Sequence, residues 1–358
     1  MRAVHVSLGN RSYAIRIAPG LLDQLGRECA RLKLGTRCVI ITDTNVGRRF
    51  AKPVFNSLAR AGFTPSLIVV PAGETAKSLK TVQTCYDLLA AHRLERKSFI
   101  VALGGGVVGD LAGFVAATYL RGIAFVQVPT TLLAQVDSSV GGKVGVNLKA
   151  GKNLVGAFYQ PRLVLCDLDT LRALPEREFR AGLAEVIKYG IIYDAKLFGQ
   201  LERDLTKLLK RDPETLARVV ARCCQIKAEV VGQDETEGGL RAILNFGHTI
   251  GHAIENVSGY GKYLHGEAIA IGQVATAKLS CALTGLSARD AGRIRDLFKL
   301  AGLPVTIKLN AVQRRKLFAV MKLDKKVSAG EIRFVLAEKI GKVVWGQPAG
   351  DELIRQVI

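Results

Sequence analysis

The first half of the chain alternates short runs of β-branched residues with helical segments, and this alternation restricts the possible folds most strongly. The runs predict strands at residues 38–42, 65–70, 98–103, 124–128 and 163–166. The segments between them predict helices near residues 45–61, 77–93 and 110–119. Strands that alternate with helices build βαβ units on a largely parallel sheet, so we expect an α/β domain in this half.

Two other regions complete the predicted architecture. Residues 2–8 and 12–17 flank Gly9-Asn10 and predict an antiparallel hairpin. From about residue 175 the pattern predicts helices at 176–189, 195–210, 213–231, 240–257, 266–284 and 287–301, and then two β-like runs at 332–336 and 342–345. A chain of 358 residues is too long for one hydrophobic core. We therefore predict an α/β domain over residues 1–174 and a mostly helical domain over residues 175–358.

The composition is that of an ordinary globular protein, with 49% hydrophobic and 23% charged residues. No stretch approaches the roughly 20 apolar residues that a membrane span needs, and the first ten residues lack the apolar core of a signal peptide. Seven scattered cysteines, an odd number, do not make a disulfide framework. We therefore expect a cytoplasmic, reduced protein without a membrane partner.

A formal net charge of +20 is compatible with nucleic acid, an anionic membrane surface or anionic metabolites as partners. Proteins that bind nucleic acid usually concentrate their basic residues and stack bases on aromatic side chains. Here Lys and Arg are spread along the chain, and aromatic residues make up only 6% of it. We therefore expect most of the excess charge to be solvated surface, with a few cations that bind an anionic small-molecule substrate, and no nucleic acid.

Three of the five histidines lie within 18 residues, and this window predicts a metal site. His248 and His252 are four residues apart, so on a helix they share one face, and His265 follows beside Glu267. An isolated pair is more often part of a core, but a third histidine in a chain so poor in them favours metal ligation. Thr249 follows His248 where a zincin has its catalytic glutamate, so the window does not indicate a metalloprotease.

Glycine-rich turns follow successive predicted strands. Gly104–Gly109 has the spacing of a dinucleotide-binding turn and is expected to open a helix at Asp110, where backbone N–H groups suit a pyrophosphate. The acidic residue that a Rossmann site carries about 20 positions later is missing, so we predict a non-standard Rossmann-like arrangement. Asp137–Asn147 is not a P-loop, but Lys143 and the nearby Lys152 lie among glycines that suit an anion. Together the turns predict a nucleotide beside a phosphorylated substrate.

These motifs resemble those of the 3-dehydroquinate synthase family of sugar phosphate cyclases, in the same order over nearly the whole chain. The matching segments are residues 43–45, 71–77, 104–114, 129–143, 184–188, 245–255 and 264–267. The resemblance implies NAD, used and regenerated within each turnover, and one divalent metal ion, zinc or cobalt. It also implies conversion of 3-deoxy-D-arabino-heptulosonate 7-phosphate to 3-dehydroquinate and phosphate, a lyase reaction of the shikimate pathway. The steps would be oxidation, phosphate elimination, reduction and aldol closure.

The resemblance also assigns the residues of the site. The implied metal ligands are Glu185, His248 and His265, of which Glu185 has no signal of its own in the sequence. The residues implied to bind or act on the substrate are Arg121, Asp137, Lys143, Lys152, Asn153, Lys188, Lys227, Arg241, Asn245, His252 and Lys325. The residues implied to surround NAD are Asp43, Asn45, Gly73, Glu74, Lys77, Gly105, Gly106, Val107, Val108, Gly109, Asp110, Thr130, Thr131, Lys143, Lys152, Thr170 and Leu171.

Some of these residues carry further implications. His252 would hold the substrate phosphate, whereas Lys227 and Arg241 would bind the substrate carboxylate. Arg121 would reach the site of a neighbouring subunit, which implies a homodimer. Val144 stands where the family usually has threonine, so we expect one polar contact near the cofactor to be lost.

Three alternatives stay open. Another sugar phosphate cyclase, such as a 2-deoxy-scyllo-inosose or valiolone synthase, would share the fold, the NAD and the metal ion but use a substrate without a carboxylate. A metal-dependent polyol or glycerol-phosphate dehydrogenase would release NADH. A basic nucleic-acid-binding protein is the third alternative. The cations Lys227 and Arg241 favour an acidic substrate, because a closed pocket would leave them unpaired otherwise.

Overall fold

The computed structural model describes residues 1–259, 261–323, 327–328 and 331–358 of the chain. It divides the chain into two compact units. The first unit comprises Met1–Leu174 together with Leu216–Thr236, and the second comprises Pro175–Thr215 together with Glu237–Ile358.

The first unit is built on a seven-stranded sheet with the strand order β1-β2-β9-β6-β5-β3-β4. Its strands are β1 (Arg2–Val6), β2 (Tyr13–Ala18), β3 (Arg37–Asp43), β4 (Thr64–Val70), β5 (Phe99–Gly104), β6 (Ala124–Pro129) and β9 (Leu163–Asp167). Strand β1 pairs with β2 antiparallel, and every other pair in the sheet is parallel. The predicted α/β class, the five strands and the N-terminal hairpin are confirmed.

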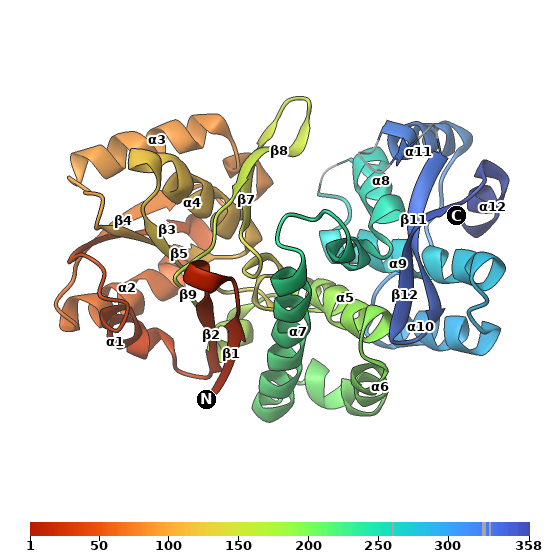
Figure 1. Cartoon of the computed structure of the whole chain (residues 1–358), viewed down its shortest axis with the longest axis horizontal. Coiled ribbons are helices and arrows are strands. Elements are labelled where there is room, and N and C mark those ends of the chain that lie inside the picture. The colour runs from red at the N-terminus through yellow and green to blue at the C-terminus, as the bar shows by residue number, and fades with distance from the viewer. Residues whose placement is uncertain (260, 324–326, 329–330) are drawn as a thin grey trace. The chain divides into compact units, whose positions relative to one another are not determined.

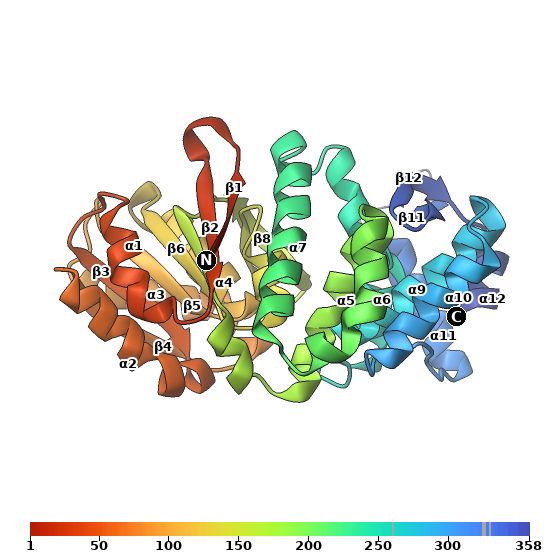
Figure 2. The same cartoon turned by 90° about the horizontal axis from the view of Figure 1, so that it is seen from below.

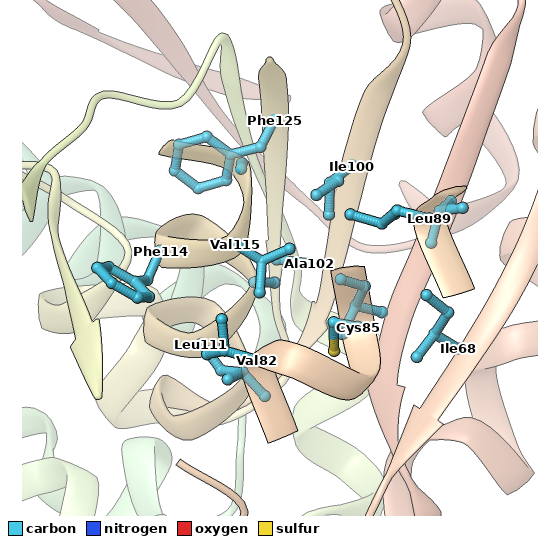
Figure 3. Close-up of a cluster of buried hydrophobic side chains, with 14 of the residues drawn as sticks. Ile68, Val82, Cys85, Leu89, Ile100, Ala102, Leu111, Phe114, Val115 and Phe125 are labelled. Atoms are coloured by element: carbon cyan, nitrogen blue, oxygen red, sulfur yellow. The ribbon is translucent and has the colours of Figure 1, made fainter. Parts of the chain in front are cut away.

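Helices cover both faces of this sheet, because successive side chains of a buried strand point to opposite faces. On strand β3, Cys38 and Ile40 pack in the core beneath α1 (Leu25–Ala30) and α2 (Thr44–Arg60). Val39 and Ile41 pack in the other core, beneath α3 (Leu79–Ala91) and α4 (Gly106–Thr118). Figure 1 shows α3 and α4 on one side of the strands and α1 and α2 on the other. Figure 3 shows the second core, which contains Val82, Cys85 and Leu89 of α3 together with Leu111, Phe114 and Val115 of α4.

The glycine-rich stretch after β6 contains a hairpin that the sequence analysis did not predict. It consists of β7 (Lys143–Leu148) and β8 (Gly151–Phe158), after a π-helical turn η5 (Ala134–Ser138). A Cβ on Gly145 would lie 2.6 Å from Val155 O, and one on Gly156 would lie 2.3 Å from Val144 O. These two glycines are therefore needed for the close approach of the paired strands, and the anion-cradle interpretation does not explain them.

The second unit is mostly helical, as predicted (Figure 2). Its helices are α5 (Glu176–Ile192), α6 (Ala195–Leu209), α8 (His248–Ser258), α9 (His265–Leu283), α10 (Ala288–Leu300), α11 (Ala311–Leu323) and α12 (Asp351–Val357). The strands β10 (Val327–Ser328), β11 (Glu331–Lys339) and β12 (Lys342–Pro348) form a small antiparallel sheet. One core joins α8, α9, α11 and β11. Neither α11 nor α12 is among the helices predicted from the sequence.

Helix α7 (Pro213–Gln233) corrects the predicted domain boundary. The helical pattern from residue 175 onward predicted it in the second domain, but Leu216–Thr236 packs with the first unit. The reason lies in its contacts with η5. Cys224 Sγ donates to Gln135 O at 3.2 Å, and Lys227 Nζ donates to Asp137 Oδ1 at 2.7 Å.

Two predicted helix boundaries are also wrong. The helix expected over residues 240–257 is split into the 3-10 segment η7 (Leu240–Asn245) and α8, because Gly247 has a φ of +78°. A Cβ at Gly247 would lie 2.6 Å from Gln273 N, so the break is required by packing. Helix α4 begins at Gly106 and not at Asp110.

The cysteines of the described chain carry free thiols, and six of the seven are buried. Among the described residues, no helix has both the length and the apolar character needed to cross a membrane.

Candidate functional site

Three side chains that the resemblance assigned to a metal ion converge in the second unit. Glu185 lies in the middle of α5, whereas His248 and His265 are the first residues of α8 and α9. His248 Nε2 lies 3.4 Å from Glu185 Oε1, and His265 Nε2 lies 3.7 Å from the same oxygen. The potential ligand atoms of the three residues all lie within 4.8 Å of one another.

Glycines bring the helices that carry these residues into close contact. A Cβ at Gly266 would lie 1.8 Å from Ala181 O, so the start of α9 packs directly on the backbone of α5. A Cβ at Gly272 would lie 2.2 Å from Gly247 O, so α9 also packs on the start of α8. These contacts place two helix N-termini beside the buried Glu185.

The histidine rings are oriented toward Glu185 by partners on their opposite nitrogens. His248 Nδ1 lies 3.1 Å from Phe246 O, and His265 Nδ1 lies 3.2 Å from Glu255 Oε2. If each Nδ1 donates to its oxygen, each Nε2 is the ring nitrogen on the side of Glu185 that would ligate a metal ion when the ring is neutral. Two imidazole nitrogens and one carboxylate are the donor set of a catalytic zinc site, so these residues fit a divalent metal ion.

The cluster is also electrostatically coupled. Burial lowers the pKa of His265, but hydrogen bonds with Glu185 and Glu255 raise it, and the balance is a pKa of about 10. Binding of a metal ion to His265 must therefore release a proton. Glu185 also forms an ion pair with Lys188, which is buried one turn further along α5.

A further ion pair ties α5 to the start of α9, and the sequence analysis did not find it. Arg177 donates to both carboxylate oxygens of Glu267, at 2.7 and 2.8 Å, and to Lys262 O at 2.9 Å. Glu267 Oε2 accepts from Leu264 N at 2.8 Å. The third position of a helix is the place of a capping glutamate, so the sequence held a signal for Glu267 but none for Arg177.

The Gly266 contact yields a prediction about stability. Gly266→Ala is expected to destabilise the protein by about 3 kcal/mol, because the new Cβ meets backbone atoms that cannot rotate away. The matched control is Gly292→Ala in α10, where a Cβ would meet nothing within 4 Å. The control should stabilise by about 0.5–1 kcal/mol, since alanine favours a helix more than glycine. Chemical unfolding measures both, and equal stabilities would contradict the close packing of α5 and α9.

The other predicted substrate residues of the second unit lie on two elements. The ring centroid of His252 is 5.3 Å from that of His248 and 5.9 Å from that of His265. Arg241 is buried in η7. Asn245 Nδ2, at the end of η7, donates to Glu237 Oε1 at 2.9 Å. Lys325 lies outside the described residues.

The predicted NAD residues of the first unit follow the carboxyl ends of its parallel strands. Glu74 follows β4, Asp43 ends β3, Gly105 follows β5, Thr130 follows β6 and Thr170 follows β9. Strands β3 and β5 are neighbours in the middle of the sheet. Strand β4 follows β3 toward one edge of the sheet, and β6 follows β5 toward the opposite edge, so the strand order reverses between β3 and β5. Ligands of open α/β sheets bind at such a reversal.

A side chain on the turn after β5 would crowd the neighbouring side chains. A Cβ at Gly105 would lie 3.1 Å from Thr131 Cγ2, and one at Gly106 would lie 3.0 Å from Ser138 Oγ. Gly105 caps α4 without a side-chain hydrogen bond. Backbone N–H groups at the N-terminus of a helix suit the pyrophosphate of a dinucleotide.

Polar residues beside this turn form a network. Lys77, which is buried, donates to Asp110 and also to Asn153 Oδ1 at 2.5 Å. Asn147 Nδ2 donates to Glu74 Oε1 at 2.8 Å. Burial raises the pKa of Asp110, and the ammonium group of Lys77 opposes that shift. The network places Asn153, predicted for the substrate, beside Lys77, predicted for NAD.

The structure pairs two residues that the resemblance assigned separately to the substrate. Lys227 Nζ donates to Asp137 Oδ1 at 2.7 Å and to Asp137 O at 2.8 Å. Lys143 is exposed on β7 and Lys152 is half-buried on β8. Arg121 is exposed and has a φ of +67°.

Comparison with known proteins gives matches to one family over most of the chain. Models of the N-terminal and C-terminal parts of 3-dehydroquinate synthase match residues 67–181 and 182–327. The 3-dehydroquinate synthase of Geobacter metallireducens is 53% identical over 95% of this chain and 94% of its own length. That of Nostoc punctiforme is 50% identical over 99% and 98%.

Solved structures of two cyclases superpose on nearly the whole chain. A 2-deoxy-scyllo-inosose synthase complexed with carbaglucose-6-phosphate, NAD⁺ and Co²⁺ superposes with a TM-score of 0.90 at 28% identity, covering 99% of both chains. The 2-epi-5-epi-valiolone synthase of Streptomyces hygroscopicus, with NAD⁺ and Zn²⁺ bound, superposes with a TM-score of 0.87 at 29% identity, covering 98% and 97%. A glycerol dehydrogenase from Schizosaccharomyces pombe, at 16% identity and a TM-score of 0.68 over 96% and 88%, shares the fold.

The α/β sheet with its glycine turn and the helical unit with its histidine cluster define an enzyme of the sugar phosphate cyclase class. Its activity class is that of a lyase. The chain belongs to the 3-dehydroquinate synthase family.

Proposed function

We propose that this chain converts 3-deoxy-D-arabino-heptulosonate 7-phosphate to 3-dehydroquinate and phosphate. The observation that carries the proposal is the convergence of Glu185, His248 and His265 in a chain of this family. The identity of about half to curated 3-dehydroquinate synthases over nearly the full length supports it. The reaction belongs to the shikimate pathway.

The proposed cofactors are NAD and one divalent metal ion, zinc or cobalt. When bound, NAD would accept and return a hydride, and the metal ion would polarise the oxygen at the reacting carbon. Solved relatives contain NAD⁺ with Co²⁺ or Zn²⁺. Glu185, His248 and His265 would hold the metal ion. The residues proposed around NAD are Asp43, Asn45, Gly73, Glu74, Lys77, Gly105, Gly106, Val107, Val108, Gly109, Asp110, Thr130, Thr131, Thr170 and Leu171.

The side chains of this chain would bind and orient an acidic phosphorylated sugar. Lys227 and Arg241 would pair with its carboxylate, and His252 with its phosphate. The other residues proposed for substrate hydroxyls and phosphate are Asp137, Lys143, Lys152, Asn153, Lys188, Asn245 and Lys325. The leaving phosphate would take the proton from the neighbouring carbon, which reduces the need for a protein base.

The substrate carboxylate distinguishes this function from that of the other cyclases. Lys227 and Arg241 are both buried cations, and a cation is the type of group that binds a substrate carboxylate. The 49–53% identity to 3-dehydroquinate synthases, against 28–29% to the inosose and valiolone synthases, supports the same choice.

The proposed setting is a cytoplasmic homodimer that binds no nucleic acid. Spread basic charge and free cysteines support the setting. Arg121 is proposed to reach the neighbouring subunit's site.

A phosphate-release assay tests the function. Protein supplied with catalytic NAD and zinc or cobalt is expected to release phosphate from the heptulosonate 7-phosphate without net accumulation of NADH. The control is the same assay with glucose 6-phosphate, which should release no phosphate. Steady NADH production would indicate a dehydrogenase, and turnover of glucose 6-phosphate would indicate an inosose synthase.

A further inference from the structure

We propose that Glu255 is a positioning residue, which holds the ring of His265 in the orientation and tautomer that a metal ion needs. The inference rests on the proposed metal site and adds to it a residue that does not touch the ion. Glu255 belongs to the histidine window of the sequence, yet neither its spacing nor the family resemblance gave it a role.

The geometry places Glu255 behind His265. Glu255 lies on α8, seven residues after His248, and its carboxylate faces the first residue of α9. His265 Nδ1 lies 3.2 Å from Glu255 Oε2, while His265 Nε2 lies 3.7 Å from Glu185 Oε1. The imidazole therefore stands between two carboxylates, with one nitrogen toward each.

His248 and His265 differ in the kind of group that faces the Nδ1 atom of each ring. His248 Nδ1 faces a backbone oxygen, Phe246 O, which no substitution removes. His265 Nδ1 faces a side chain. The side chain of His265 is also 32% exposed, whereas that of His248 is 10% exposed, so packing restricts His265 less. The orientation of His265 therefore depends more on its hydrogen bond with Glu255.

The carboxylate also supports the chemistry of ligation. By accepting from Nδ1–H, Glu255 places the proton on the nitrogen that points away from the cluster and leaves the Nε2 lone pair for a metal ion. A negative charge behind the ring makes the imidazole a stronger donor. Loss of such a partner typically weakens metal binding about 10- to 100-fold.

A second group of possible metal ligands, which also includes His265, gives a competing hypothesis. One ligand atom each from His252, Glu255 and His265 also lie within 4.8 Å of one another. In that arrangement Glu255 would itself coordinate an ion. The positioning role predicts one ion per chain, whereas direct ligation by Glu255 at a separate site predicts two.

The test is a Co²⁺ titration of the metal-free full-length protein, with a chelator to set the free ion and visible absorption to report the coordination. Glu255→Ala is expected to weaken Co²⁺ binding about 10- to 100-fold and to alter the visible bands. Glu255→Gln should weaken it less, because the amide oxygen still accepts from Nδ1–H but carries no charge. The matched control is Asn256→Ala, which changes the exposed neighbour on α8 and should leave both readouts unchanged.

The outcomes separate the possibilities. Unchanged Co²⁺ affinity and spectrum in a folded Glu255→Ala protein would overturn the proposal. Two ions per wild-type chain, with one lost in Glu255→Ala and the other unaffected, would overturn it too. If Glu255→Ala does not fold, the same criteria apply to Glu255→Gln. Because no step uses the sugar phosphate, a Glu255-dependent Co²⁺ site in a protein that releases no phosphate would refute the proposed reaction but leave this inference standing.

Discussion

Glu185→Gln is expected to lower kcat/KM for the proposed reaction by about a thousandfold or more. Glu185 is completely buried and its Oε1 faces both His248 and His265, so the amide leaves the cluster without its anionic donor. A catalytic metal ion stabilises the transition state by several kcal/mol, and each 1.4 kcal/mol corresponds to about a tenfold change in rate. Metal content by mass spectrometry and phosphate release measure the two effects.

The control for this variant is Glu178→Gln, an exposed carboxylate on the same helix. It should retain metal content and turnover. The melting temperature of Glu185→Gln is also expected to fall, because the buried ammonium group of Lys188 loses its carboxylate partner. Full metal occupancy together with wild-type turnover in Glu185→Gln would remove Glu185 from the site.

Lys227→Met is the second substitution with a large expected effect. The side chains of Lys227 and Asp137 are 7% and 27% exposed, and removal of the ammonium group deprives a mostly buried carboxylate of the cation that donates to it. We expect a loss of about 3 kcal/mol in the free energy of unfolding. If Lys227 also binds the substrate carboxylate, kcat/KM falls by about a hundredfold.

The double variant Asp137→Asn with Lys227→Met separates these effects. It is expected to recover most of the lost stability, since neither charge of this pair remains, but not the activity. Arg222→Met is the matched control, because Arg222 lies on the same helix in a partly exposed pair with Glu229 at 3.7 Å. Chemical unfolding and kinetics measure all three, and wild-type kcat/KM in the double variant would refute a substrate role for both residues.

Local patterns predicted the strands of the seven-stranded sheet and most helices because each depends on neighbours in sequence. The run at residues 38–42 became a strand buried on both faces, as continuous apolar residues indicate. Asp43 caps the next helix by accepting from Asn45 N and Val46 N at 2.8 and 3.0 Å. The spacing of His248 and His252 correctly predicted neighbouring rings.

The errors arose where a contact between distant segments decided the structure. Gly145 and Gly156 let strands β7 and β8 approach closely, but the sequence around each glycine does not indicate this contact. Gly247 ends a helical pattern that continues on both sides, because Gln273 from α9 occupies the space of a side chain. Leu216–Thr236 has an ordinary helical pattern, and only its contacts with η5 place it in the first unit.

By itself, the sequence determined an α/β unit followed by a helical one, a glycine turn after β5 and a window of histidines. Tertiary structure alone brought Glu185 to that window and placed Glu255 behind His265. The physical reason is that hydrogen bonding and hydrophobic periodicity are encoded within a few residues, whereas the convergence of α5, α8 and α9 depends on backbone contacts at Gly266 and Gly272.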